Sequence, residues 1–335
     1  MNSESVNALY GYSSELPLLK DKTIDDQLEF LRSLGVNALF GGYEKPELVE
    51  KAHSKGMKIY AELSCFVGQE WWEKYPSSRP VTAKGEKLQC EGWYCGVNPS
   101  VPAVRKELLG QLKDLLKKPV DGVWLDFIRW PCHWEDPHPC LPRTSFDRGT
   151  LDRFSQESGL DLDLPEERER AADRILKDHR SRWIAWRCGV IESWVAQARR
   201  LRDRLRPRLT LGLFGVPWRP EDHGEAIREI IGQDYGALSQ SVDVFSPMAY
   251  HLMVGRKPDW VGKVVDKTRE MTGRPVWPVV QSVDQPRTLA PSQYGQVLRV
   301  AKESGGRDGL IVFTAEGVLE DRDKLEETKR IFAQD

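Results

Sequence analysis

The feature of this sequence that most restricts its fold is the alternation of short β-rich runs with amphipathic helical stretches along the whole chain. Such alternation is typical of a parallel sheet. Eight runs have the composition of buried strands: Ala8–Gly11, Ala38–Gly42, Lys58–Leu63, Gly122–Phe127, Thr210–Phe214, Val242–Met248, Val276–Gln281 and Gly309–Phe313. Because eight parallel strands close a barrel, we predict an α/β fold, a single (β/α)8 TIM barrel over residues 1–335.

The stretches between these runs repeat Leu, Ile and Val at three- and four-residue spacing, as amphipathic helices do. The predicted helices are Ile24–Leu34, Val104–Leu116, Ala226–Leu238, Trp260–Met271, Tyr294–Ser304 and Lys324–Phe332. A doubly wound open sheet is the structural alternative, but no glycine-rich dinucleotide fingerprint follows any strand. The chain has 335 residues, 40% of them hydrophobic, and can bury one large core without dividing into two domains.

Charge and hydropathy disfavour two classes of partner. The formal net charge is −2 and no long block of like charge occurs, so we expect no nucleic-acid partner. No apolar run reaches the roughly 20 residues of a membrane helix, so we expect no membrane partner.

The N-terminus lacks the basic and apolar regions of a signal peptide, which predicts a soluble, cytoplasmic protein unless a leader has been removed. Oligomeric state is left open.

Cysteine usage does not suggest a disulfide scaffold. Cys90 with Cys95, and Cys132 with Cys140, form two pairs in tryptophan-rich loops, and two histidines lie beside the second pair. The spacing does not match the C-x2-C pattern of structural zinc sites, so we expect neither a metal nor another cofactor. Loop disulfides are an alternative if the protein is exported.

Two predicted loops, Ser64–Val101 and the inserted region 129–165, are longer than a barrel requires and flank its fourth strand. Several aromatic side chains fall in loops at the predicted barrel mouth: Trp71, Trp72, Trp93, Trp130, Trp134 and Trp218. Flat rings suit the apolar C–H faces of sugars, so the group predicts a carbohydrate ligand. Trp183, Trp186 and Trp194 instead recur on a helical period, which favours packing of that helix onto the barrel.

Asp126 is the leading candidate for catalysis. It follows the buried run Val123–Leu125, so its carboxyl group is expected at the barrel mouth, where the catalytic groups of this fold lie. Arg129 is close enough in sequence to hold an ionised Asp126, which would suit a nucleophile or a charge stabiliser. The alternative is a structural ion pair that braces the loop.

Glycoside hydrolysis needs a second carboxylate, and the sequence offers several. We favour Glu316 and then Glu62, because each directly follows or ends an apolar strand, where partial burial could raise the pKa toward that of a general acid. Asp222, Asp284 and, less strongly, Glu44 are further options.

Other side chains are candidates for contact with substrate. Tyr10, Tyr250, His251 and Gln281 fall at strand ends, where they could bond sugar hydroxyls, although structural hydrogen bonds are equally consistent with these positions. The predicted substrate-binding set is Tyr10, Arg129, Trp130, Trp93, Trp218, Tyr250, His251 and Gln281.

Three segments resemble the uncharacterised glycoside-hydrolase-like barrel families. Asn98-Pro99, followed by Val104-Arg105, is similar to the Asn-Pro and Val-Arg that precede their fourth strand. Asp121–Pro131 resembles their fourth strand, which ends in Asp-Tyr-Ile-Arg-Phe-Pro. Val242–His251 resembles their Ser-Pro-Met segment and, distantly, the Met-Ala-Tyr of family 18 chitinases.

The resemblance implies a carbohydrate-active barrel with Asp126 as its principal carboxylate. Relatives of this broad group include a hydrolase of partly deacetylated poly-N-acetylglucosamine. That relative has consecutive acidic residues after its fourth strand, whereas Phe127 follows Asp126 here. The Asp-x-x-Asp-x-Asp-x-Glu motif of chitinases is absent, so their substrate-assisted mechanism is not implied.

The first hypothesis is therefore a glycoside hydrolase that acts on an oligo- or polysaccharide through a carboxylate pair centred on Asp126. The alternative is a carbohydrate-binding barrel without catalysis, because fold alone does not establish chemistry. Whether Glu316, Glu62 or Asp222 faces Asp126 discriminates between the two. Metal-dependent hydrolysis such as deacetylation is a weaker third class, because the histidines show no paired ligand spacing.

Overall fold

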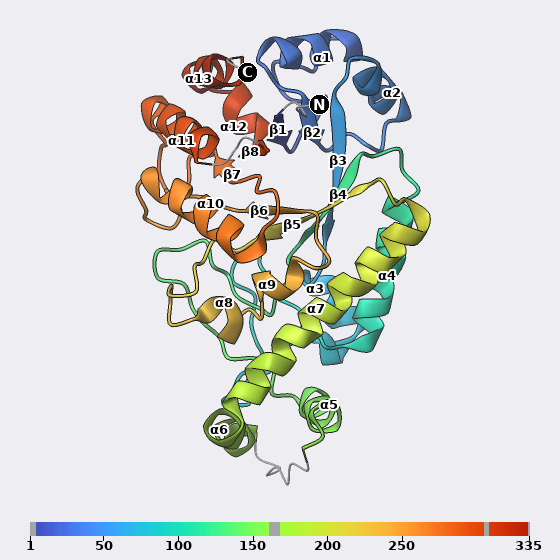
Figure 1. The fold of residues 1–335 in the computed structure, drawn as a ribbon, viewed down its shortest axis with the longest axis vertical. Coiled ribbons are helices and arrows are strands. Elements are labelled where there is room, and N and C mark those ends of the chain that lie inside the picture. Colours follow the sequence, from blue (N-terminus) through green and yellow to red (C-terminus); the bar gives the residue numbers. More distant parts are fainter. Residues whose placement is uncertain (1–4, 161–167, 305–307, 334–335) are drawn as a thin grey trace.

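The computed structural model describes residues 5–160, 168–304 and 308–333. Within them lie the strands β1 (Val6–Tyr10), β2 (Ala38–Phe40), β3 (Lys58–Ser64), β4 (Gly122–Asp126), β5 (Thr210–Gly215), β6 (Val244–Pro247), β7 (Val279–Gln281) and β8 (Gly309–Phe313). They form one eight-stranded parallel sheet in the order β6-β5-β4-β3-β2-β1-β8-β7. Parallel bridges from Phe245 to Val276 and from Met248 to Val279 join its two ends. The predicted (β/α)8 barrel is confirmed (Figure 1).

Helices surround the sheet and follow most of the predicted segments. They are α1 (Ile24–Ser33), α2 (Pro46–Ser54), α3 (Gln69–Lys74), α4 (Pro102–Leu115), α5 (Arg148–Ser158), α6 (Arg168–Asp178), α7 (Arg180–Leu205), α8 (Ala226–Glu229), α9 (Tyr235–Leu238), α10 (Asp259–Thr272), α11 (Pro291–Glu303), α12 (Ala315–Leu319) and α13 (Arg322–Phe332). The single helix predicted over Ala226–Leu238 is two short helices instead. Gly232 lies between them with a φ of +67°, a left-handed conformation that interrupts a right-handed helix.

The long helix α7 extends beyond the barrel and carries α5 and α6 near its far end (Figure 1). These three helices and the preceding loop share a small apolar cluster, built from Phe146, Leu151, Phe154, Ala171, Ala172, Ile175 and Trp183. The helical period had suggested that Trp183 packs onto the barrel. Trp183 packs in this outer cluster instead. Trp194 does pack toward the barrel, with its ring 5.7 Å from that of Phe66.

Aromatic side chains fill the barrel interior. Trp124 of β4 lies at the centre of this packing, with its ring 4.8 Å from Tyr60 and 5.1 Å from both Phe40 and Trp277. Its indole N–H donates a 2.9 Å hydrogen bond to Ser246 Oγ of β6. The barrel is thus a packed core, and any opening to substrate must lie at an end of the strands.

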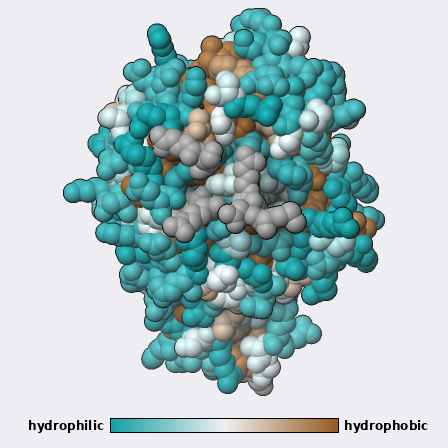
Figure 2. Space-filling model, turned by 45° about the horizontal axis from the view of Figure 1, so that its top comes forward, coloured by the Kyte–Doolittle hydropathy of each residue, from teal (hydrophilic) through white to brown (hydrophobic). Residues whose placement is uncertain are grey.

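Figure 2 shows one face of the molecule, on which hydrophilic residues predominate and hydrophobic ones occupy small separate areas. Over the described residues, the large hydrophobic side chains with substantial exposure are Leu18, Trp93 and Leu205. No described helix combines the length and apolar character needed to cross a bilayer.

The fit of Trp124 depends on the absence of a side chain at Gly212, its partner in the register of β4 with β5. A Cβ at Gly212 would overlap the indole of Trp124. We expect Gly212→Ala to lower the free energy of unfolding by about 1–3 kcal/mol through overpacking. Gly110→Ala is the matched control, because Gly110 lies in α4 with open space at its Cβ position. Urea denaturation should show no loss, or a gain of up to about 1 kcal/mol, for that control.

Candidate active site

Asp126 and Glu62 lie on neighbouring strands at the carboxyl end of the barrel. Asp126 ends β4, and its register partner on β3 is Ser64, two residues beyond Glu62. Alternate residues of a strand face the same side of the sheet. Tyr60 and Trp124 point into the barrel, so Glu62 and Asp126, two residues further along β3 and β4, point inward as well. The aromatic interior therefore forms the floor beneath both carboxyl groups.

Asp126 lies in an environment that favours its protonated form. Its side chain is only 11% exposed. Burial, together with the nearby negative charge of Glu62, raises the pKa of Asp126 to about 8, although Arg129 and the Phe127 N–H act in the opposite direction. The expectation that Arg129 keeps Asp126 ionised is therefore wrong. The closest guanidinium nitrogen is 4.0 Å from Asp126 Oδ1, too far for a hydrogen bond.

The backbone after Asp126 adopts an unusual conformation. Phe127 has a φ of +51°, in the left-handed region that bulky residues rarely occupy. Its N–H donates a 2.6 Å hydrogen bond to Asp126 Oδ1. Strained backbone of this kind clusters at functional sites, where it positions a neighbouring group. Here the turn at Phe127 fixes the orientation of the Asp126 carboxyl group.

Arg129 is buried beside the site, with 1% of its surface exposed. Its guanidinium group lies over two rings, 4.8 Å from the centre of Phe127 and 5.7 Å from that of Tyr94. The two terminal nitrogens make no hydrogen bond within the described part of the chain. The charge of Arg129 is thus held mainly by aromatic faces, which explains its weak effect on Asp126.

Glu62 is held by two hydroxyl groups. Tyr10 of β1 donates a hydrogen bond to Glu62 Oε2, and Ser64 Oγ donates one of 2.7 Å to Glu62 Oε1. Both carboxyl oxygens are acceptors, which is the role of an ionised carboxylate. Tyr10 is itself half buried, and burial and the Glu62 charge raise the pKa of its phenol. The structure brings three residues predicted from the sequence, Asp126, Glu62 and Tyr10, into one site.

Glu135 is a third carboxylate at this site, and sequence reasoning missed it. It lies in the loop after β4, its side chain is 16% exposed, and its negative charge contributes to the raised pKa values of Asp126 and Tyr250. The imidazole Nε2 of His133 lies 3.5 Å from Glu135 Oε2. The acidic residue that directly follows Trp134 in this loop was the available signal.

Trp93 is the exposed ring beside these carboxylates. Its side chain belongs to the loop between β3 and α4, and the residue is 64% exposed. The ring makes edge contacts with three aromatic neighbours, at centroid distances of 5.8 Å for Tyr94, 5.9 Å for Phe127 and 5.7 Å for His133. The contact with Phe127 places Trp93 next to the residue that orients Asp126. An exposed ring held in this way can accept the apolar face of a ligand.

A disulfide between Cys90 and Cys95 closes the short loop that carries Trp93. Cys65, Cys132, Cys140 and Cys188 are free thiols. Thus one of the two sequence pairs is bonded and the other is not. The described residues contain no group of three or more His, Cys, Asp or Glu side chains suited to hold a metal ion.

Two of the loop tryptophans predicted to bind substrate are buried. Trp130 is 0% exposed and its indole N–H donates a 3.0 Å hydrogen bond to the Arg187 carbonyl of α7. Trp218 is 5% exposed and packs 5.0 Å from the ring of His223. The expectation that these rings lie open at the mouth is therefore wrong. Each covers a core, which is the other way in which a loop tryptophan is stabilised.

The residues predicted at the ends of β6 and β7 have different positions. The ring of Tyr250 stacks on that of Trp134 at 5.7 Å and, because it is buried next to Asp126, the pKa of its phenol is raised. His251 is buried, and burial lowers its pKa to about 4, so its imidazole is neutral at pH 7. The amide of Gln281 is buried and bonds four backbone groups, among them the Leu252 N–H at 3.0 Å. Tyr250 therefore faces the carboxylates, whereas Gln281 is occupied by the backbone.

The other acidic candidates have different surroundings. Glu316 is exposed in the first turn of α12, not partly buried as expected, and shares a surface cavity with Asp284 and Lys324. Asp284 accepts a 2.7 Å hydrogen bond from Lys324. Asp222 is paired with Arg219 at 3.0 Å, and Glu44 is exposed. Among the candidates for the second carboxylate, the contacts and charges of the described residues bring only Glu62 next to Asp126.

Solved structures with a similar fold include several whose names describe sugar hydrolases. The glycoside hydrolase domain of PgaB (BpsB) from Bordetella bronchiseptica matches with a TM-score of 0.68 and 14% identity, over 99% of each chain. A β-galactosidase from the psychrophilic Marinomonas ef1 matches with a TM-score of 0.69 and 14% identity, over 98% of this chain and 59% of that one. A β-galactosidase from Bacillus circulans sp. alkalophilus matches with a TM-score of 0.67 and 13% identity, over 98% of this chain and 55% of that one.

The chain thus spans little more than half the length of these galactosidases, but nearly the whole of the PgaB domain. No family model and no curated protein sequence matches it. At identities this low, the likeness establishes the shared barrel fold alone.

The buried carboxyl group of Asp126 should make stability depend on pH. Its folded-state pKa of about 8 lies above the ordinary value of 3.8 for an aspartate, so the native state retains a proton that the unfolded state loses. This contribution to stability is therefore fully present below about pH 4 and is lost as the pH rises to about 8, at a slope of about 1.4 kcal/mol per unit and by up to about 6 kcal/mol. Asp126→Asn should remove this loss, as measured by urea denaturation from pH 4 to pH 9.

Glu62→Gln is the companion variant, because it removes the negative charge that disfavours ionised Asp126. The fall in stability should then begin at the same pH as in the wild type but end at a lower pH, so that the total loss is smaller. Parallel stability curves for the wild type and Asp126→Asn would show that Asp126 titrates normally.

Proposed function

We propose that the protein is a glycoside hydrolase that acts on an oligo- or polysaccharide, with Asp126 as general acid and Glu62 as its carboxylate partner. The observation that carries the proposal is the contrast between two neighbouring carboxyl groups. Asp126 is buried, with a pKa raised to about 8, and Glu62 accepts hydrogen bonds on both oxygens. Glycoside hydrolysis uses two carboxyl groups, of which one is protonated and acts as the acid while the other is ionised and acts as base or nucleophile.

The chemistry follows from these two states. At pH 7, Asp126 is mainly protonated and can donate its proton to the glycosidic oxygen as the bond to the leaving group breaks. Glu62 then carries negative charge next to the sugar carbon, where it can attack directly or activate a water molecule. Tyr10 and Ser64 orient Glu62 in either case, while the turn at Phe127 orients Asp126.

The surrounding residues suit a sugar. Trp93 offers an exposed ring, and Tyr250 and Glu135 supply a hydroxyl and a carboxylate close to Asp126. Sugars need this combination, because they present both apolar C–H faces and many hydroxyl groups. The barrel that the chain shares with a glycoside hydrolase domain and with β-galactosidases agrees with this chemistry.

The first test is turnover of α- and β-linked polysaccharides and aryl glycosides, followed through reducing ends and released aglycone. We expect Asp126→Asn and Glu62→Gln each to lower kcat by about 10²–10⁴. Glu316→Gln is the matched control, because Glu316 is exposed and lies in a separate cavity, and it should retain activity. Full activity of Asp126→Asn would remove Asp126 from the mechanism.

If neither the wild type nor the two variants show turnover, but a saccharide raises the melting temperature of the wild type, the protein would instead be a binding protein without catalysis. The wild-type pH profile offers an independent check on the acid. Because only protonated Asp126 donates, kcat should fall as the pH rises through about 8.

Trp93 provides a separate test of the binding surface. We expect Trp93→Ala to raise KM for the polysaccharide found in this screen about tenfold, equivalent to about 1.4 kcal/mol, because a stacking surface is lost. Folding should be unaffected, since the ring is 64% exposed. Leu205→Ala is the control, because Leu205 is an exposed apolar residue at the end of α7. An unchanged KM in Trp93→Ala would exclude the ring as a sugar platform.

A further inference from the structure

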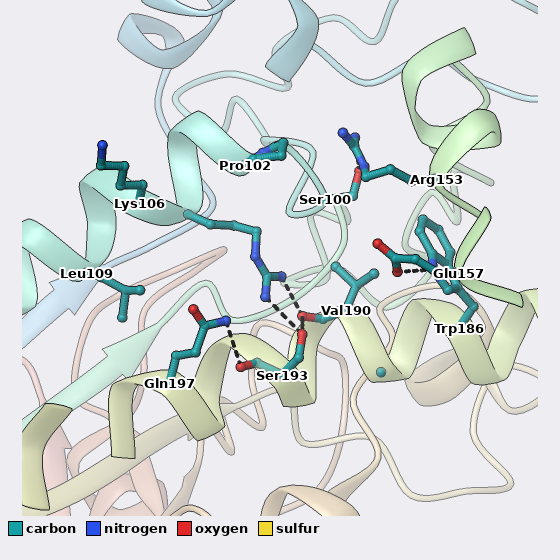
Figure 3. Close-up of a pocket in the computed structure, with 12 residues that line it drawn as sticks. Ser100, Pro102, Lys106, Leu109, Arg153, Glu157, Trp186, Val190, Ser193 and Gln197 are labelled. Carbon is teal, nitrogen blue, oxygen red and sulfur yellow. Dashed lines mark hydrogen bonds between the residues drawn. The ribbon is translucent and has the colours of Figure 1, made fainter. Parts of the chain in front are cut away.

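A second candidate binding region lies on the outside of the barrel, between α4 and α7. One cavity there has a volume of about 590 Å³, and Figure 3 shows it bounded by Ser100 and Arg153 on one side and by Val190 and Ser193 of α7 on the other. A neighbouring cavity of about 540 Å³ continues along the same two helices and shares Leu109 and Gln197 with the first. Together they form a groove, the α4/α7 groove. Volumes of this size accommodate small ligands or segments of a polymer.

Basic side chains dominate the α4/α7 groove. Six line the two cavities, against the single acidic residue Glu157; they are Arg105, Lys106, Lys113, Arg153, Arg200 and Arg204. Lys106 turns away from the first cavity (Figure 3). None of the six forms an ion pair with another side chain in residues 5–160, 168–304 and 308–333. By contrast, Arg199 and Arg202 of the same helix α7 both pair with Asp243.

Two of these cations are partly buried within the first cavity. Arg105 donates hydrogen bonds of 2.7 Å to the Val190 carbonyl and 2.9 Å to Ser193 Oγ, both of which are neutral acceptors. Arg153 donates one of 2.9 Å to Ser100 Oγ, and its Nε is buried without a partner in the described part of the chain. Burial lowers the pKa of both guanidinium groups, that of Arg105 to about 10. Nearby carboxylates act on these groups in the opposite direction, Glu157 on Arg105 and Asp147, Glu157 and Asp152 on Arg153, but none of the hydrogen bonds given above joins either arginine to a carboxylate.

Charge and shape together narrow the class of ligand. Unpaired arginines and lysines favour carboxylate or sulfate groups, which accept hydrogen bonds from several guanidinium nitrogens at once. Ser193 and Gln197 add polar groups that suit a hydroxyl-rich chain. Sites for single-stranded nucleic acids combine a positively charged groove with several aromatic rings on which bases stack, whereas Trp186 is the one aromatic residue among those lining the groove. The indole N–H of Trp186 is already bonded to Glu157 at 2.8 Å (Figure 3).

We propose that the α4/α7 groove is a second carbohydrate site, separate from the barrel mouth, that binds an acidic oligosaccharide through its carboxylate or sulfate groups. The choice of a saccharide rests on the proposed function, whereas the preference for an anion rests on the groove alone. The basic residues extend from Arg153 beside α4 to Arg204 near the end of α7, so the ligand is an extended chain rather than a single ion.

The test uses the Asp126→Asn protein, in which turnover is blocked, and titration calorimetry with a heparin hexasaccharide and a hexagalacturonate. We expect binding that weakens as NaCl rises from about 50 to about 200 mM, because the contacts are electrostatic. Lys113→Gln with Arg204→Gln should weaken binding about tenfold, because two exposed cations without structural bonds are removed. Lys263→Gln with Lys329→Gln is the control of equal charge change on α10 and α13, and should leave binding unchanged.

A third variant separates the cavity from the overall charge. Gly189 of α7 lines the first cavity with open space at its Cβ position, so Gly189→Leu places an apolar side chain at the cavity without altering the charge. We expect it to weaken binding of both saccharides while the melting temperature is maintained. Equal binding by the groove variants and the control, or no binding of either saccharide, would overturn the proposal.

A single-stranded oligodeoxynucleotide is the competing probe. If it binds more tightly than the saccharides, and its binding depends in the same way on Lys113 and Arg204, the groove is a nucleic-acid site and the proposal of a saccharide ligand is overturned. Turnover is measured separately in a protein that keeps Asp126 and carries the Lys113→Gln and Arg204→Gln substitutions. This measurement tests the barrel mouth independently of the groove. Failure of the groove inference therefore leaves the proposed function intact. Absence of hydrolysis would remove the argument for a saccharide but not the preference of the groove for an anion.

Discussion

The position of the Asp126 carboxyl group depends on the aromatic packing that fills the barrel beneath it. Trp124 occupies the barrel interior, and Gly212 on the adjacent strand leaves room for its indole. Because side chains alternate along a strand, the residue two positions later must also face inward. Asp126 is thus held over an apolar floor, where desolvation favours its neutral form. The raised pKa of Asp126 thus arises first from packing, to which the negative charge of Glu62 adds.

The loops at the carboxyl ends of β3 and β4 complete the site from both sides. The disulfide-closed loop brings Trp93 into contact with Phe127, while the loop after β4 adds Glu135. These segments lie far from one another in sequence but meet because neighbouring parallel strands end at the same edge of the barrel. The rigid scaffold carries the carboxylates, and the loops carry the exposed surface that a ligand meets first.

Charge is distributed unevenly on a molecule whose formal net charge is only −2. The barrel mouth brings together three carboxyl groups, whereas six basic residues and one acidic residue, Glu157, line the α4/α7 groove. A mean value near zero therefore conceals two regions of opposite sign. If both sites bind saccharides, they select different chemical groups on them.

The sequence by itself determined the barrel and predicted Asp126 at its mouth, because hydrophobic periodicity is local and an acidic residue ending an apolar run is visible without neighbours. It also predicted Glu62 and Tyr10 at the site, but could not rank Glu62 above Glu316, since apolar strands precede both. Only the tertiary structure decided that Glu316 is exposed, that Trp130 is buried and that burial and Glu62 raise the pKa of Asp126. The physical reason is that burial and electrostatic energy depend on groups close in space, and those groups come from distant parts of the chain.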